Sequence, residues 1–214
     1  MTELDHDFLL LINGMHTPFL DQLMWLISGK AVWIPFYLIT IFVVYKNVGW
    51  KRTIQMLLMV GLMMLFTDMV NSQVIRPWFH RLRPANLESP VGAMVHIVND
   101  YRGGRYGFPS AHAANYFGLS LIIAYFIRSW RTLYSLMALT FVICYSRSYL
   151  GVHYPGDLIA GCLYATIVVV PLLYLHNRFM PLNKHMKPIF EYIPVLSALL
   201  TIFVFAIISL TTVL

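Results

Sequence analysis

The sequence predicts an all-α fold, a polytopic membrane bundle of about six transmembrane helices preceded by a helical segment at the membrane interface. Of the 214 residues, 59% are hydrophobic and 11% are charged, whereas soluble domains carry roughly a quarter charged residues. Apolar runs that approach or reach the roughly 20 residues needed to cross a bilayer recur along the chain. One bundle accounts for the whole length, so we expect a single integral membrane domain over residues 1–214.

The first segment, residues 1–29, is expected to lie along the membrane surface. Its apolar stretch is interrupted by residues that are costly at the bilayer centre, namely Asn13, Gly14, His16, Thr17, Pro18 and Asp21. This pattern is typical of two short amphipathic helices. The chain begins with acidic residues where a signal peptide would be basic, so no signal peptide is expected.

The apolar runs that follow are expected to cross the membrane as helices. They cover residues 31–45, 54–75, 110–127, 133–149, 157–175 and 189–210. The long loop after the second run, residues 77–109, is the candidate active-site loop, because a loop of this length in a compact protein is usually functional. Asp68 and Asn71 lie late in the second run and should face the bundle interior. Asp68 either pairs with an active-site arginine or makes an interhelical hydrogen bond.

The connectors predict how the bundle is oriented. Those on one side are short and basic, as cytoplasmic loops are, and they contain none of the polar motifs described below. We therefore expect the loop 77–109 and both chain ends to face the extracytoplasmic space.

Composition also excludes some classes of partner. The formal net charge of +6 does not indicate nucleic-acid binding, because most arginines lie in the motifs or at span ends and form no long basic face. Cys144 and Cys162 lie in apolar runs, where reduced cysteines act as packing residues.

Three polar motifs interrupt the apolar runs and come to one surface if the six helices alternate in direction. Arg-x6-Arg-Pro begins at Arg76, Pro-Ser-Ala-His ends at His112, and Ser-Arg-x5-His-x3-Asp runs to Asp157. In the third motif a carboxylate one helical turn after an imidazole can orient one ring nitrogen and expose the other. Fixed guanidinium groups nearby match the oxygens of a phosphate.

These ordered motifs resemble the three-part signature of the type 2 phosphatidic acid phosphatase superfamily, which includes membrane lipid phosphate phosphatases, glucose-6-phosphatases and soluble vanadium haloperoxidases. The third motif matches at every defined position. Arg76 stands where the family usually has lysine, and Ala111 stands where it usually has glycine. By motif, the resemblance covers residues 68–161.

The resemblance implies a role for each motif residue. His153 would be the nucleophile that forms a phosphohistidine, Asp157 would orient it, and His112 would protonate the leaving oxygen and then activate water. The expected phosphate-binding residues are Arg76, Arg83, Ser110, Ala111 and Arg147. Candidate contacts to a head group or to anionic lipid are Arg81, Arg102 and Arg105 in the long loop. No metal or other cofactor is expected, because the arginines would repel a divalent cation from the two histidines and the aspartate.

We therefore expect a metal-independent membrane phosphatase of the bacterial inner membrane that acts on a lipid phosphate or diphosphate. Candidate substrates by resemblance are phosphatidylglycerol phosphate, undecaprenyl diphosphate, phosphatidic acid and a lipid A phosphate. One alternative is a lipid phosphotransferase that uses the same phosphohistidine. Another is a transport or anion-binding membrane protein without catalysis. The sequence does not predict the oligomeric state.

Overall fold

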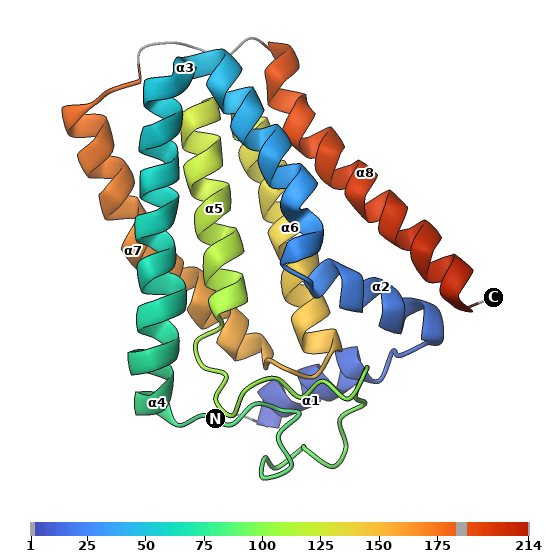
Figure 1. The fold of residues 1–214 in the computed structure, drawn as a ribbon. Helices are drawn as coiled ribbons and strands as arrows, with labels where there is room; N and C mark the ends of the chain where they lie inside the picture. The colour runs from blue at the N-terminus through green and yellow to red at the C-terminus, as the bar shows by residue number, and fades with distance from the viewer. Residues whose placement is uncertain (1–2, 183–187, 214) are drawn as a thin grey trace.

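The computed structural model describes residues 3–182 and 188–213, and over these residues it is a bundle of helices with one long loop at its lower end (Figure 1). Apart from one isolated bridge between Leu82 and Tyr106, these residues form no β-structure. The all-α architecture predicted from the sequence is confirmed.

Two short helices form the N-terminal segment, as predicted. α1 covers Glu3–Asn13 and α2 covers Pro18–Ser28. Thr17 caps α2 by accepting a hydrogen bond from the Leu20 N–H, and Pro18 occupies the first turn, where its missing N–H costs nothing. The Asn13 side chain donates to the carbonyl of Tyr149 at 2.7 Å and to that of His96 at 3.0 Å. These bonds fix α1 against the long loop and the end of another helix.

The first two predicted spans form one bent element. After a short 3-10 turn, η1 (Ala31–Trp33), α3 (Ile34–Met64) continues through the π-helical segment η2 (Leu65–Ile75) into α4 (Arg76–Phe79). Gly49 has φ +80° and ψ 170°, which breaks the helix and folds α3 into two legs. The short connector expected between the runs 31–45 and 54–75 is therefore helical except at this glycine, which can adopt such a conformation without a steric penalty.

Four more helices complete the bundle. They are α5 (Ala111–Ile127), α6 (Trp130–Tyr149), α7 (Pro155–Phe179) and α8 (Pro188–Val213). α5 and α7 approach closely at Gly161, where an added Cβ would lie 2.4 Å from the Ser110 carbonyl oxygen. By length and hydropathy alone, Ala31–Phe79, Pro155–Phe179 and Glu191–Val213 are long and apolar enough to cross a membrane.

The long loop starts three residues later than its predicted beginning at 77, because α4 extends to Phe79. It folds back across the lower ends of the helices (Figure 1). The Ala85 N–H donates to the Gly151 carbonyl at 2.8 Å, and the Gly107 N–H donates to the Arg81 carbonyl at 2.9 Å. The loop is thus bonded both to itself and to the connector that follows α6.

Candidate active site

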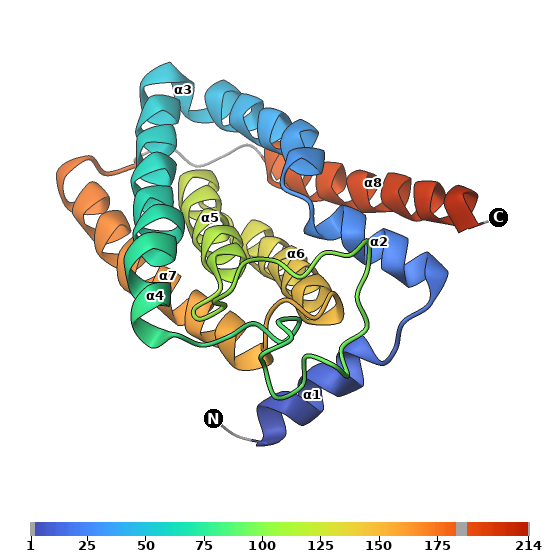
Figure 2. The same cartoon turned by 60° about the horizontal axis from the view of Figure 1, so that its bottom comes forward.

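The three motifs meet at one end of the bundle, beneath the long loop (Figure 2). Arg76 begins α4, His112 lies in the first turn of α5, and Arg147 lies in the last turn of α6. His153 lies in the short connector between α6 and α7, and Asp157 lies in the first turn of α7. The structure therefore brings together residues that are far apart in the sequence.

His153 is held both by its own backbone and by Asp157. Gly151 has φ +67°, a left-handed conformation that lets the chain turn before the histidine. The Ser148 hydroxyl donates to the His153 carbonyl at 3.1 Å. The imidazole is fully buried, and its Nδ1 lies 3.4 Å from Oδ2 of Asp157. A proton on Nδ1 faces the carboxylate, which leaves the lone pair on Nε2.

Asp157 is itself fixed at the start of α7. Its Oδ2 accepts a hydrogen bond from the backbone N–H of Tyr154 at 3.0 Å, in the manner of a capping box. Its side chain is completely buried. The carboxylate can therefore hold the imidazole in one orientation.

Three buried or half-buried arginines lie near the other side of His153. Nη1 of Arg83 is 3.2 Å from Nε2 of His153 and donates to the Val152 carbonyl at 3.1 Å. Arg147 donates to the Ser28 hydroxyl, and among the described residues its buried Nε has no hydrogen-bond partner. Nε of Arg76 donates to the Pro109 carbonyl at 3.1 Å, beside the second motif.

The positive charges act on His153 and on one another. Burial lowers the pKa of His153 well below its ordinary value, and the charges of Arg83 and Arg147 lower it further, so the imidazole is neutral at pH 7. Burial, together with the charges of Arg76 and Arg147, lowers the pKa of Arg83 to about 10, which leaves Arg83 protonated. In the described part of the chain, none of the three arginines forms an ion pair with an acidic side chain. The cluster therefore carries buried positive charge that an anion would neutralise.

The second motif places a helix N-terminus at the same site. The Ser110 hydroxyl caps α5 by accepting from the Ala113 N–H at 3.4 Å, and the Ser110 N–H donates to the Asp157 carbonyl at 2.9 Å. Ala111 is buried as the first residue of the helix. The N–H groups of a first helical turn favour an anion. His112 follows them and lines two cavities.

The loop arginines contact the protein in different ways. Arg102 donates to the Ala85 carbonyl at 2.7 Å, and Arg105 forms an exposed ion pair with Glu88 at 2.9 Å. Arg81 is largely buried and donates to Asp157. Its contact with a head group thus stays a prediction, while its contact with Asp157 is a feature that sequence reasoning missed.

Asp68 does not pair with an active-site arginine, which was the first of its two expected roles. It forms an ion pair with Lys30 at 3.4 Å and has no such pair with an arginine among the described residues. The neighbouring Asn71 donates to the Pro109 carbonyl at 3.2 Å, so this residue does link η2 to the second motif.

A chain of charged groups connects α1 to His153. Arg81 donates from one guanidinium nitrogen to Asp157 and from the other to Asp5 of α1. Asp5 also accepts from the Gly156 N–H at 2.8 Å, which fixes it to the start of α7. No local pattern in the sequence distinguishes Asp5 from the other acidic residues near the N-terminus.

Comparisons with known proteins show the family to which the chain belongs. The sequence profile of the PAP2 superfamily matches residues 52–181, which is more than half of the chain and includes all three motifs. The chain belongs to the PAP2 superfamily. This confirms the resemblance seen in the motifs, and the relatives described next confirm the prediction of a phosphatase that acts on membrane lipids.

Two lipid A 4'-phosphatases are similar to the chain over most of their length. The lipid A 4'-phosphatase of Bacteroides thetaiotaomicron is 40% identical over 164 residues, which cover 76% of this chain and 72% of that protein. The lipid A 4'-phosphatase of Porphyromonas gingivalis is 32% identical over 178 residues, which cover 82% of this chain and 75% of that protein.

A solved PAP2 structure shares the fold. The crystal structure of a transmembrane PAP2-type phosphatidylglycerolphosphate phosphatase from Bacillus subtilis matches with a TM-score of 0.61 and 20% sequence identity, over 83% of this chain and 89% of that one. At this identity the likeness concerns the fold alone, and it confirms that the bundle is of the membrane PAP2 type.

Proposed function

We propose that this PAP2 chain removes the 4'-phosphate of lipid A, or of a closely related acylated sugar phosphate, through a phosphohistidine on His153 and without a metal ion. Two lipid A 4'-phosphatases, 40% and 32% identical to the chain, support this substrate class. The observation that carries the chemistry is the excess of buried arginine charge beside a neutral imidazole whose Nδ1 is held by Asp157.

The first step is attack on phosphorus by the Nε2 lone pair of His153. A P–N bond forms while the P–O bond to the lipid breaks, and His112 gives its proton to the departing oxygen. Asp157 stabilises the positive charge that the imidazole gains. Arg76, Arg83 and Arg147 stabilise the charge spread over the phosphoryl oxygens.

The second step returns the enzyme to its starting state. His112, now neutral, accepts a proton from water as the water oxygen attacks phosphorus, and the P–N bond breaks to release inorganic phosphate. Because His153 and Asp157 are fully buried beneath the long loop, bulk water does not reach them freely. The site should face the extracytoplasmic side of a bacterial inner membrane, because the connectors at the opposite end are the short basic ones.

The test is phosphate release by the purified protein in detergent with EDTA present. Lipid A should lose one phosphate, observed by mass spectrometry, faster than phosphatidylglycerol phosphate or undecaprenyl diphosphate loses phosphate, and His153→Asn should be inactive. Faster release from a glycerophospholipid would overturn the substrate assignment. Dependence of the activity on an added metal would overturn the metal-free mechanism. Transfer of the phosphoryl group to another lipid without release of phosphate would show a phosphotransferase.

A further inference from the structure

Two cavities flank His112, and their linings differ. The first has a volume of about 350 Å³ and lies between α2, η1, the long loop and the ends of α5 and α6 that carry the motifs. Its wall includes two aromatic residues, Trp25 and Tyr101, whose rings meet edge-to-face with centroids 5.4 Å apart. Arg147 also lines it. This first cavity, which we call the chamber, therefore combines aromatic surface with the guanidinium group of Arg147, one of the three clustered arginines.

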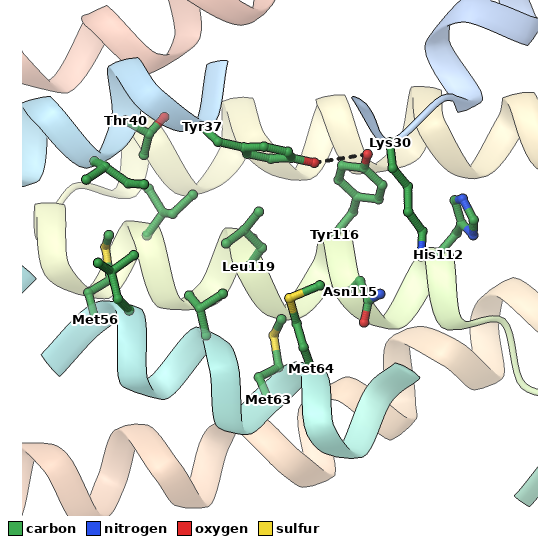
Figure 3. A pocket seen from close by; sticks show the side chains of 14 residues that line it. Lys30, Tyr37, Thr40, Met56, Met63, Met64, His112, Asn115, Tyr116 and Leu119 are labelled. Carbon is green, nitrogen blue, oxygen red and sulfur yellow. Dashed lines mark hydrogen bonds between the residues drawn. The ribbon is translucent and has the colours of Figure 1, made fainter. Parts of the chain in front are cut away.

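The second cavity is almost entirely apolar and lies within the bundle (Figure 3). It has a volume of about 290 Å³ and runs between the two legs of α3 and the facing side of α5. We call this second cavity the groove, and its lining includes Ile41, Met56, Leu57, Val60 and Leu119. Its side chains belong to membrane-spanning helices, so the material that fits this groove is hydrocarbon.

The chamber and the groove share two lining residues, His112 and Lys30. Figure 3 shows both side chains together at one end of the groove, with Leu119 further along it. Lys30 also forms an ion pair with Asp68 at 3.4 Å. The proposed general acid therefore stands where an aromatic, polar space and an apolar space meet.

We propose that these two cavities form one binding site for the leaving group of the reaction, an acylated sugar. The sugar ring occupies the chamber against Trp25 and Tyr101, and one of its acyl chains occupies the groove along Leu119. This inference rests on the proposed function and extends it by assigning the residues that recognise each half of the glycolipid.

The leaving-group chemistry explains the placement of each part. The oxygen that departs belongs to the sugar, so the sugar must lie beside His112, the residue that protonates this oxygen. The C–H faces of a sugar pack on aromatic rings, and a few polar groups fix its orientation. An acyl chain gains little free energy by moving from a membrane into an apolar groove, since both are apolar. The groove therefore acts by positioning the sugar oxygen, and not by increasing overall affinity.

The experiment compares three phosphate donors, from which first the acyl chains and then the sugar are removed. The first is lipid A, which has sugar and acyl chains, and the second is the fully deacylated phosphorylated disaccharide. The third is acetyl phosphate, which has neither part. The wild-type protein should hydrolyse all three, with the highest kcat/KM on lipid A. Failure of the wild type on both sugar substrates, with acetyl phosphate still hydrolysed, would refute the proposed function itself, and this inference with it.

Two pairs of variants then test the cavities. Trp25→Leu keeps apolar volume but removes the ring, and it should lower kcat/KM roughly three- to tenfold on both sugar substrates and leave acetyl phosphate unchanged. Its control is Trp130→Leu, an exposed tryptophan at the far end of the bundle. Leu119→Trp fills the groove and should lower kcat/KM about ten- to hundredfold on lipid A alone, because the displaced chain shifts the reacting oxygen. Its control is Leu58→Trp, on an exposed face of α3 outside the groove.

The pattern across substrates decides the inference. Losses of equal size on all three donors would mean that these residues only maintain the fold, and the assignment of both cavities would fail. A loss on the deacylated sugar in Leu119→Trp would place the sugar, and not the chain, in the groove and would overturn the proposed arrangement. Unchanged lipid A hydrolysis in both Trp25→Leu and Leu119→Trp would show that the leaving group lies elsewhere.

Discussion

Replacing Asp5 with asparagine should slow phosphoryl transfer although Asp5 lies in α1, outside the three motifs. In the structure the Asp5 carboxylate accepts hydrogen bonds from Arg81 and from the Gly156 N–H, and Arg81 also donates to Asp157. Asparagine can still accept from Gly156, but it loses the charge that holds the guanidinium. Arg81 is then free to shift, and the carboxylate that orients His153 shifts with it.

The burial of these groups sets the size of the effect. The side chains of Arg81 and Asp5 are 8% and 11% exposed, so their hydrogen bond is only partly screened by water. A charge-assisted hydrogen bond contributes roughly 1.5–3 kcal/mol, and we expect this loss in the free energy of unfolding. If about half of it appears in the transition state, kcat falls by roughly three- to tenfold while KM changes little. Asp7→Asn on the same helix is the matched control, because Asp7 is exposed and has no ion pair among the described residues.

The assay is rapid mixing with p-nitrophenyl phosphate, which reports formation of the phosphohistidine as a burst of nitrophenolate. Asp5→Asn should slow the burst, and Arg81→Lys should slow it by at least as much, since one ammonium group cannot bridge two carboxylates as a guanidinium does. A normal burst rate in Asp5→Asn, with only the melting temperature reduced, would show that the contact is purely structural. An equal slowing in Asp7→Asn would show a general effect of the charge of α1.

Three further predictions test the site and its orientation. His112→Ala should be severely impaired on a lipid phosphate, by a factor on the order of 10²–10⁴. Its nitrophenolate burst should be impaired much less, because nitrophenolate leaves without a proton. His153→Ala should show no burst, and a burst would overturn its assignment as nucleophile. Gly107→Ala should lower kcat about tenfold or more, because the added Cβ would lie 3.0 Å from Oδ2 of Asp157 and 3.5 Å from Nδ1 of His153; unchanged kinetics would show that the loop yields there. Leu87 is 69% exposed in the long loop. In a protein without its two native cysteines, a cysteine in place of Leu87 should react with an impermeant thiol reagent in intact cells. Labelling only after lysis would show that the loop faces the cytoplasm.

The pKa of His153 predicts a stability effect with a definite sign. Below about pH 6.5 the unfolded chain binds a proton on this residue that the folded chain does not, because burial holds the folded pKa well below that value. Stability should therefore fall as the pH drops from 7 to 5. His153→Asn should lose less melting temperature over this range, and an equal loss in both proteins would refute the buried neutral histidine.

The motif residues could be found from the sequence because their chemistry is encoded locally. The spacing of His153 and Asp157 places both at the start of one helix, and the order of the spans brings the arginines to the same end. The partner of Arg81 could not be found in this way, because an arginine in a loop is exposed by default. Its burial depends on α1 folding back over the site, and Asp5 and Arg81 are separated by 76 positions. Lys30 was missed because its pair with Asp68 depends on the geometry of the bent α3 element.

The ends of the helices and of the long loop were less predictable than the presence of these elements. The basic residues around position 49 indicated a turn, yet the helix needs only one non-helical residue there, the glycine with φ +80°. The loop begins after Phe79 because the helix that carries the first motif continues beyond Arg76. In both cases local charge marked the right region, while backbone hydrogen bonding determined where the helix ended.

The bend of α3 at Gly49 lies at the opposite end of the bundle from the candidate active site (Figure 1). The two legs of α3 form opposite walls of the groove, and the angle between them is set at this single residue. An added Cβ would meet no neighbouring atom within 4 Å, so only its positive φ argues against a side chain there. A residue with a side chain would be strained at this φ, so a substitution should change the angle between the two legs. The selectivity of the enzyme for lipid shape could therefore be tuned from the opposite face of the membrane, without a change to any residue that touches phosphate.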